Sequence, residues 1–445
     1  MPTALTELAV PQDKKTVRRL SFAMAKSPKL NVGPTIVVPP KHIGMPGEAH
    51  ETAAALELAK HKLARQDATG QFSEPTTPPE TDVTDSYAFA FDIDGVLVRG
   101  GKAIPEAIEA MKVLNGQNEL GIKMYVSRSA KTSASELTLI RPYIFLTNGG
   151  GKTEQERCID LSRQLQLEIS PGQFICGHTP MREMAEKYDT VLVVGGEGEK
   201  CREVAEGYGF KDVVTPGDII KDNKDTTPFR TLTEDEVSNS RVRNFGEHKI
   251  DAIFVFADSR DWAGDQQIIL DLLTSKDGRI GTRSESFDEG PPIYFSHNDF
   301  IWSASHQNTR LGMGALRGSI EYLYKGITGK DLVSTAFGKP QIGTFQFATR
   351  LLQQWRKDTH GINKPPETVY FVGDTPSSDI RGTNEFDESP LSNNTWYSIL
   401  VRTGVYQEGT KPEFAPKATV DNVLEAVKHG IKREKLKADK TLNAR

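Results

Sequence analysis

The sequence predicts an α/β fold in which parallel β-sheets are covered by helices. From Tyr87 onward, short apolar stretches of strand length alternate with amphipathic stretches of helix length, and this alternation is typical of strand–helix–strand units. Polar residues suited to chemistry directly follow several of the apolar stretches, as they do at the carboxyl ends of parallel strands. At 445 residues the chain is too long for one small core, so we expect about two or three domains.

The expected elements follow one another in a regular order. We expect strands at residues 88–92, 142–147, 173–176, 190–194, 250–257, 292–296, 368–372 and 397–401. We expect helices at residues 105–114, 155–165, 179–188, 311–324 and 342–357. A glycine cluster at 195–198 fits a tight strand-to-helix turn better than a dinucleotide loop, because Cys201 stands where that motif needs its third glycine.

Three polar regions are expected to lie outside the sheets. Residues 1–84 are rich in Pro, Thr, Ser and charge, so we expect a mostly disordered extension with one helical stretch at 52–65. The polar residues 221–249 predict a surface excursion. Residues 431–445 form a basic tail that we expect to stay solvated.

The composition argues against several classes of protein. A net charge of -5 favours no nucleic-acid partner, and no stretch approaches the roughly 18 to 20 apolar residues of a membrane span. Three cysteines outside any CxxC spacing indicate neither a disulfide framework nor a zinc site. The basic N-terminus lacks the apolar stretch of a secretory signal. We therefore expect a protein that is not secreted, with mitochondrial and cytoplasmic locations both open.

The most informative stretch is an apolar run that leads into Asp92, Asp94 and Gly95. Two carboxylates at the end of a buried strand repel each other unless a cation offsets their charge. The pair predicts a phosphoryl-transfer nucleophile, a proton shuttle and a bound metal ion. Taken alone it fits a solvated acidic turn equally well. An EF-hand loop is excluded, because its glycine falls at the sixth position and Gly95 is at the fourth.

A second strand end carries Thr147, Asn148 and Gly149. A hydroxyl and a run of flexible backbone amides at a strand tip suit the oxygens of a phosphoryl group. Thr147 by itself would equally fit a cap of the following helix.

A lysine and a second acidic pair complete the pattern. Lys339 precedes Pro340, which suits the first turn of a helix. An ammonium there can neutralise charge on an attacking carboxylate and a transferring phosphoryl group, although an isolated lysine is more often a surface residue. The strand at 368–372 runs into Asp374 and then Asp379. Asp374 is a candidate ligand for Mg²⁺, and Asp379 a candidate to hold a ligating water.

These four features, in this order, resemble the motifs of the haloacid dehalogenase superfamily. The pattern is Asp-x-Asp-Gly-Val, a strand ending in Thr, a Lys, and Gly-Asp-x-x-x-x-Asp. Further stretches are similar to subfamily IIA and, within it, to the cat eye syndrome critical region type with its fungal mitochondrial relatives. They lie at residues 143–151, 171–173, 258–262, 311–315 and 396–401. The resemblance covers about residues 85 to 430.

The resemblance implies a Rossmann-like core with a parallel sheet and a large α/β cap of the C2 type inserted between Thr147 and Lys339. The cap is expected to choose the substrate by closing over the site, and caps of this type often mediate homodimers in the superfamily. The expected division is an extension at 1–84, a first core part at 85–149, a cap at 150–328, a second core part at 329–430 and a tail at 431–445.

The chain departs from the family pattern in two places. The family commonly has Asn-Pro-Asp at the exit of a cap strand, and this chain has His297-Asn298-Asp299. Only Asp299 is therefore carried over, as a residue near the substrate. Residues 125–141 form a polar, Ser-rich stretch where little is expected, which indicates a loop insertion or an artefact of the gene model.

The implied activity is Mg²⁺-dependent hydrolysis of a small phosphorylated metabolite. Asp92 would attack phosphorus and form an aspartyl-phosphate, and Asp94 would protonate the leaving alcohol and then activate water. The other implied roles are catalysis by Thr147 and Lys339, substrate contact by Asn148, Gly149 and Asp299, and metal binding by Asp92, the backbone carbonyl of Asp94, Asp374 and Asp379. Two alternatives stay open: a catalytically silent scaffold that binds a phosphorylated ligand, and phosphotransfer to an acceptor other than water.

Overall fold

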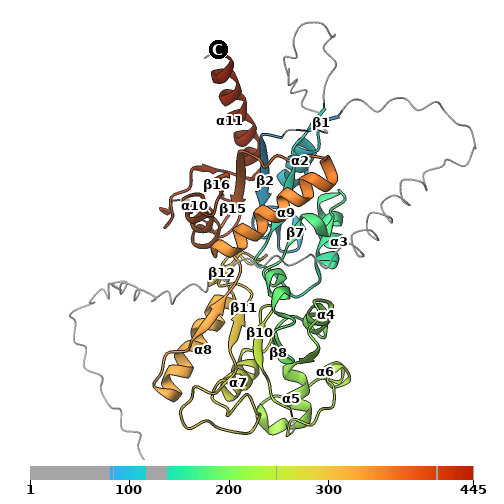
Figure 1. Cartoon of the computed structure of the whole chain (residues 1–445), viewed down its shortest axis with the longest axis vertical. Coiled ribbons are helices and arrows are strands. Elements are labelled where there is room, and N and C mark those ends of the chain that lie inside the picture. Colours follow the sequence, from blue (N-terminus) through green and yellow to red (C-terminus); the bar gives the residue numbers. More distant parts are fainter. Residues whose placement is uncertain (1–80, 84, 117–137, 247, 407–408, 444–445) are drawn as a thin grey trace, which may run out of the picture. The chain divides into compact units, whose positions relative to one another are not determined.

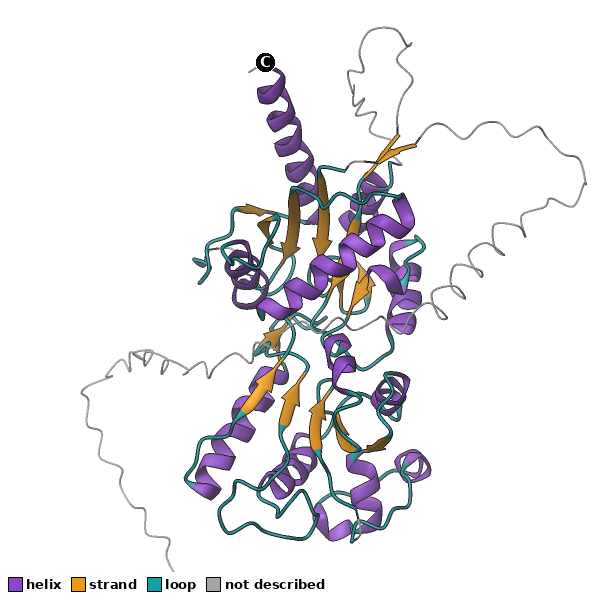
Figure 2. Cartoon of the chain, viewed as in Figure 1, coloured by secondary structure: helices purple, strands orange, loops and turns teal. Residues whose placement is uncertain are grey.

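The computed structural model describes residues 81–83, 85–116, 138–246, 248–406 and 409–443. Within them, two main sheets are each accompanied by helices (Figures 1 and 2). This confirms the expected α/β class. The helix expected at 52–65 and most of the stretch at 125–141 lie outside the described residues.

The first sheet has six strands in the order β17-β16-β15-β2-β6-β7, and every neighbouring pair is parallel. The strands are β2 (Tyr87–Phe91), β6 (Tyr143–Leu146), β7 (Phe174–Ile175), β15 (Thr368–Gly373), β16 (Thr395–Val401) and β17 (Ala418–Val420). In the centre, β2 pairs with β15 so that Phe91 lies opposite Val372. The residues that follow these two strands therefore emerge together at one edge of the sheet.

Both faces of this sheet are buried. Phe89 and Phe91 share one core with residues of three helices, α2 (Pro105–Leu114), α3 (Glu154–Leu165) and α11 (Val423–Asn443). Ala88 and Ala90, which point the other way, share a second core with residues of α9 (Ile342–His360) and α10 (Arg381–Asp387). Burial on both faces explains why the strands are continuously apolar rather than alternating.

The second sheet is formed by chain that lies between Thr147 and Lys339. Its five strands are all parallel, in the order β14-β11-β10-β8-β9. They are β8 (Thr190–Val194), β9 (Asp212–Val214), β10 (Ala252–Val255), β11 (Ile293–Phe295) and β14 (Ser334–Ala336). The division into domains stays a proposal, and β14 falls after the boundary expected at 329 although it belongs to this sheet.

Helices cover this sheet as well. One core joins it to α5 (Pro216–Asp222), α7 (Trp262–Leu273) and α8 (Met313–Thr328). Another joins it to α4 (Lys200–Gly207) and to the 3₁₀ segment η2 (Thr179–Met184). The remaining short elements are β1 (Thr81–Val83), β3 (Val98–Arg99), β4 (Lys102–Ala103), β5 (Thr138–Ile140), η1 (Pro171–Gln173), η3 (Lys224–Thr226), α6 (Glu234–Asn239), β12 (Ile301–Trp302), β13 (Arg310–Leu311) and the π-helical turn η4 (Pro376–Ile380).

Three expected elements differ from the structure. The helix expected at 179–188 is the short η2, in which the amides of Met181 and Ala185 bond to carbonyls only three residues back. The helix expected at 311–324 begins at Met313, since Leu311 pairs with Ile301 in a hairpin. The stretch at 221–249 is not only loop, because a capping box at Thr233 starts α6.

Candidate active site

The carboxyl edge of the first sheet gathers the predicted acidic residues. Asp92 follows β2 and Asp374 follows β15, and the parallel pairing of these strands brings both residues to one place. Oxygens of Asp92, Asp374 and Asp379 all lie within 4.8 Å of one another, and all three residues are buried. The side chain of Asp94 is outside this group, and metal binding by its backbone carbonyl stays a prediction.

The buried carboxylates carry more negative charge than the protein itself offsets. Burial raises the pKa of Asp92 well above its usual value, and Asp379 and Asp374 raise it further, against the opposing effect of Lys339. Burial and the Asp379 charge likewise raise the pKa of Asp374 to about 7. Three hard oxygen donors with a surplus of negative charge fit a magnesium-type divalent cation.

Lys339 supplies the positive charge within this group. Its side chain is almost fully buried, and Nζ lies 2.7 Å from Asp92 Oδ1 and 2.8 Å from Asp379 Oδ1. Burial alone would lower the pKa of Lys339, but the charges of Asp379 and Asp92 raise it above its ordinary value. The ammonium is therefore retained, and one cation faces three carboxylates.

Asp379 fixes the backbone at Asp374, and two glycines allow other backbone to approach the Asp374 carboxylate. Asp379 Oδ2 accepts hydrogen bonds from the backbone amides of Asp374 and Thr375, both at 3.0 Å. A Cβ at Gly95, where φ is +88°, would lie 2.3 Å from Asp374 Oδ2, and one at Gly404 would lie 1.8 Å from the same oxygen. Only glycine allows the backbone to approach the carboxylate so closely, which gives a physical reason for the glycine after Asp94.

The residues that were expected to bind a phosphoryl group lie beside the carboxylates. Thr147 is buried, and its Oγ1 accepts a hydrogen bond from the Gly149 amide at 3.0 Å. A Cβ at Gly149 would lie 3.4 Å from Asp94 Oδ2, so this backbone runs next to the expected proton shuttle. The Asp94 side chain is 39% exposed, whereas that of Asp92 is 10% exposed. Asp94 therefore has the access to water that proton exchange requires.

Asn148 connects the second sheet to the first. Its Oδ1 accepts from the Lys339 amide at 2.7 Å, and its Nδ2 donates to the Lys339 carbonyl at 3.1 Å. The same Nδ2 donates to Asp299 Oδ2 at 2.9 Å. The structure thus brings Asp299 to the site through Asn148, and direct contact of either side chain with substrate stays a prediction.

Sequence reasoning missed three contributors. Arg157 on α3 lies with a guanidinium nitrogen 3.7 Å from Asp94 Oδ2. Its Nε is buried and has no hydrogen-bond partner among the residues that the structure describes. The Val405 amide donates to Asp374 Oδ2 at 2.6 Å, and Gly404 precedes it. No side-chain pattern marks Val405, because its contribution comes from the backbone. For Arg157 the only available signal was its position, since it is an arginine in the first turns of a helix after Thr147.

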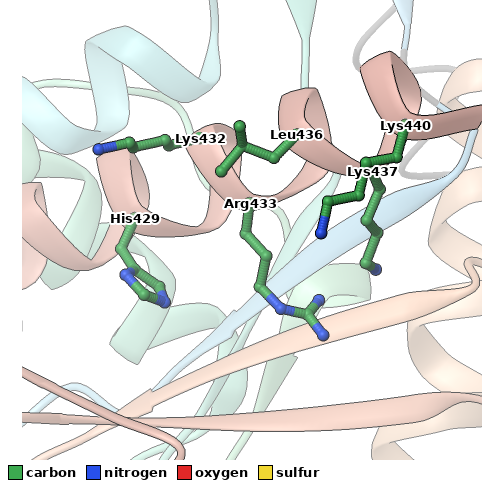
Figure 3. Close-up of a pocket in the computed structure, with 6 residues that line it drawn as sticks. All are labelled: His429, Lys432, Arg433, Leu436, Lys437 and Lys440. Carbon is green, nitrogen blue, oxygen red and sulfur yellow. The ribbon is translucent and has the colours of Figure 1, made fainter. Parts of the chain in front are cut away.

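A separate hollow of about 470 Å³ lies along α11 (Figure 3). It is lined by His429, Lys432, Arg433, Leu436, Lys437 and Lys440. Lys437 donates to Thr368 at the start of β15, so the hollow lies at the opposite edge of the sheet from Asp374. Its lining contains no carboxylate, and it takes no part in the candidate chemistry.

No helix in the described part of the chain is both long and apolar enough for a membrane crossing.

Comparison with known proteins gives consistent matches. A family model for haloacid dehalogenase-like hydrolases matches residues 89–211, and a second HAD-like hydrolase model matches residues 336–426. A mitochondrial hydrolase of Saccharomyces cerevisiae is 38% identical over 362 residues, which are 76% of this chain and 94% of that protein. A cardiolipin synthase (CMP-forming)/mitochondrial hydrolase fusion protein of Schizosaccharomyces pombe is 37% identical over 377 residues.

That match covers 84% of this chain and 58% of the fusion protein, so the chain spans little more than half of that relative. Among solved structures, a p-nitrophenyl phosphatase from Archaeoglobus fulgidus aligns with a TM-score of 0.47 and 17% identity, over 78% of this chain and 100% of that one.

Proposed function

Because this chain belongs to the haloacid dehalogenase-like hydrolases, we propose that it is a Mg²⁺-dependent phosphatase that hydrolyses a small phosphorylated molecule through an aspartyl-phosphate. The observation that carries the proposal is the contact of the buried Lys339 ammonium with Asp92 at 2.7 Å, inside a group of three carboxylates. A nucleophilic carboxylate held in this way needs a further cation before an anionic phosphate ester can approach.

Each residue has a distinct part in the proposed reaction. An Asp92 oxygen attacks phosphorus, the ester oxygen leaves with a proton from Asp94, and Asp94 then takes a proton from the water that hydrolyses the acyl phosphate. Thr147 Oγ1 accepts the Gly149 amide hydrogen, which leaves the Thr147 hydroxyl hydrogen free for a phosphoryl oxygen, and substrate contact by Gly149 stays a prediction. Lys339 offsets charge on Asp92 throughout.

The metal site would be formed by Asp92, Asp374 and the backbone carbonyl of Asp94. A divalent cation there would supply charge neutralisation for the carboxylates and the phosphoryl group. Asp379 has one oxygen on two backbone amides and the other beside Lys339. It would therefore act from outside the metal's ligand shell, by fixing the positions of the Asp374 loop and of the Lys339 ammonium.

Turnover of an aryl phosphate by the purified full chain with Mg²⁺ tests this function. We expect hydrolysis by the wild type, no hydrolysis by Asp92→Asn, and unchanged hydrolysis by the control Asp331→Asn, whose side chain is 84% exposed. Borohydride reduction during turnover should convert the acyl phosphate at Asp92 to homoserine, which mass spectrometry detects. A folded wild type that binds phosphate and is inert toward a broad panel would favour the scaffold alternative. Phosphate esters formed in the presence of alcohols would favour phosphotransfer.

The names of the two relatives support a mitochondrial location, and we propose that this chain works there. Imaging of the full chain fused to a fluorescent protein tests the location. A homodimer formed through the region of the second sheet is likewise a proposal, which light scattering tests.

A further inference from the structure

A hollow of about 360 Å³ opens between the β12–β13 hairpin and the loops that follow β15 and β16. It adjoins the candidate active site directly. Thr375, which lines it, donates its hydroxyl to Asp374 Oδ1 at 3.2 Å. Val405, which also lines it, donates its amide to Asp374 Oδ2. A ligand in this hollow would therefore extend away from the carboxylates where phosphoryl transfer is proposed.

The hairpin side of the hollow is apolar and exposed. Phe300 and Ile301 line it and are 61% and 37% exposed. Trp302 and Leu311 of the same hairpin are 38% and 59% exposed. Large apolar side chains gathered on one small hairpin are costly to leave in water and usually mark a binding surface.

Hydrogen bonds fix the position of the hairpin relative to the candidate active site. Its strands pair Ile301 with Leu311, and the Gly312 amide donates to the Phe300 carbonyl at 3.0 Å. The preceding residue, Asp299, accepts a hydrogen bond from Asn148. The apolar side chains are thus held at a fixed place beside the catalytic groups.

The opposite side of the hollow mixes apolar and polar residues and carries no net charge. Pro376, Val405 and Tyr406 are half-buried there, and Ser and Thr hydroxyls also line it. The charged lining residues are Lys411 and Glu413, which have opposite signs. A side without net charge offers little to a second anion, and the apolar hairpin that faces it suits an uncharged apolar group.

We propose that the hollow binds the leaving-group side of the substrate, and that this side is a bulky, uncharged apolar group, either aromatic or alkyl. This inference rests on the proposed phosphatase function, since it assigns the phosphoryl group to the carboxylate edge and the alcohol part to the hairpin. The substrate class is then a monophosphate ester of an apolar alcohol.

Turnover by the full chain with Mg²⁺ tests the assignment on naphthylmethyl, octyl and methyl phosphate, which all release an alkoxide-type leaving group. We expect kcat/KM of the wild type to be at least about tenfold higher for naphthylmethyl or octyl phosphate than for methyl phosphate. Phe300→Ala should reduce that ratio about tenfold, while the control Tyr322→Ala, at a side chain 79% exposed on α8, keeps it. The naphthylmethyl and octyl arms distinguish an aromatic from an alkyl group. Because a folding defect lowers all three rates together, the ratio isolates selectivity.

Binding separates this proposal from the proposed function. Calorimetry with naphthylmethylphosphonate and methylphosphonate needs no turnover. Preference for the bulky phosphonate, lost in Phe300→Ala, would support the apolar hollow even if every phosphate ester proved inert. Equal binding, a preference for the small phosphonate, or a preference unaffected by Phe300→Ala would overturn it. So would a change of oligomeric state in Phe300→Ala with selectivity unchanged, because the hairpin would then be an interface between copies of the chain.

Discussion

Asn148 binds both backbone polar groups of Lys339: Oδ1 accepts from the Lys339 amide at 2.7 Å, and Nδ2 donates to the Lys339 carbonyl at 3.1 Å. The two residues are 191 positions apart in the chain. Lys339 follows β14 of the second sheet, yet its ammonium lies beside Asp92, at the carboxyl edge of the first sheet. The amide of Asn148 therefore sets where the buried ammonium meets Asp92.

The two hydrogen bonds between the Asn148 side chain and the Lys339 backbone form a clamp. Loss of this clamp should lower the turnover rate more than it weakens substrate binding. In Asn148→Ala we expect kcat to fall by about 100-fold, because a misplaced catalytic group costs about that much. We also expect a loss of about 1–3 kcal/mol in the free energy of unfolding, since buried backbone groups lose their partners. Steady-state kinetics and urea denaturation measure the two effects. The exposed Asn244→Ala is the control, and a rise in KM with unchanged kcat would contradict the positioning role.

Stability without metal should depend on pH through Asp374. Because the folded-state pKa of Asp374 is raised to about 7 and the unfolded value is about 4, its protonated form is favoured in the folded protein. The metal-free protein should therefore lose stability as pH rises from about 4 to about 7. Urea denaturation in EDTA at about pH 5 and about pH 8 measures this.

Mg²⁺ should counteract that loss. A cation that binds the ionised carboxylates stabilises the folded state by mass action, so we expect a larger Mg²⁺-induced rise in the free energy of unfolding at about pH 8 than at about pH 5. In Asp374→Asn the rise should be much smaller. An equal or larger effect of Mg²⁺ at the lower pH would argue against a metal site at these carboxylates.

Arg157 should assist Asp94. Its guanidinium lies 3.7 Å from Asp94 Oδ2, beside the Gly149 backbone. We expect Arg157→Met to lower kcat by about tenfold, in the range of effects on positioned acid–base groups. The matched control is Arg163→Met on the same helix, whose side chain is 77% exposed. Equal kinetics for the two variants would show that Arg157 has no part in the reaction.

A buried ion pair should stabilise the second sheet without touching the chemistry. Arg202 makes two hydrogen bonds of 2.8 Å to Asp218, and both side chains are fully buried. Burial alone would raise the pKa of Asp218, but the hydrogen bonds from Arg202 and the Arg241 amide hold it below its usual value.

Arg202→Met should therefore cost up to about 3–5 kcal/mol in the free energy of unfolding, because Asp218 loses its two 2.8 Å hydrogen bonds from Arg202 and keeps the more distant Arg243 at 3.5 Å. The contribution should be present above about pH 4 and lost as pH falls through the lowered pKa of Asp218. Urea denaturation measures both. Arg381→Met, at an exposed pair with Glu385, should cost at most about 1 kcal/mol. Similar losses in the two variants would contradict the role of burial.

The α/β class, most of the elements and the residues that gather at the carboxyl edge could be predicted from the sequence alone. Asp92, Thr147 and Asp374 each follow a continuously apolar strand, and such strands are recognisable because burial on both faces leaves no polar position. Parallel pairing then places their ends together. The helix expected at 179–188 and the start of the helix at Met313 were less predictable, since they depend on the three-residue hydrogen bonds of η2 and on the pairing of Leu311, which compete with helix periodicity.

How the remaining groups join the site follows from the three-dimensional arrangement alone. The amide of Val405, the closeness of Gly404 to Asp374 and the position of Arg157 beside Asp94 have no side-chain spacing that marks them. The first two depend on the loop that follows β16, and the third depends on where α3 packs. The clamp between Asn148 and Lys339, and the apolar hairpin at Phe300, follow in the same way from how the second sheet's loops meet the first sheet's edge. A linear pattern records which side chains are available, but through-space distances determine which of them act together.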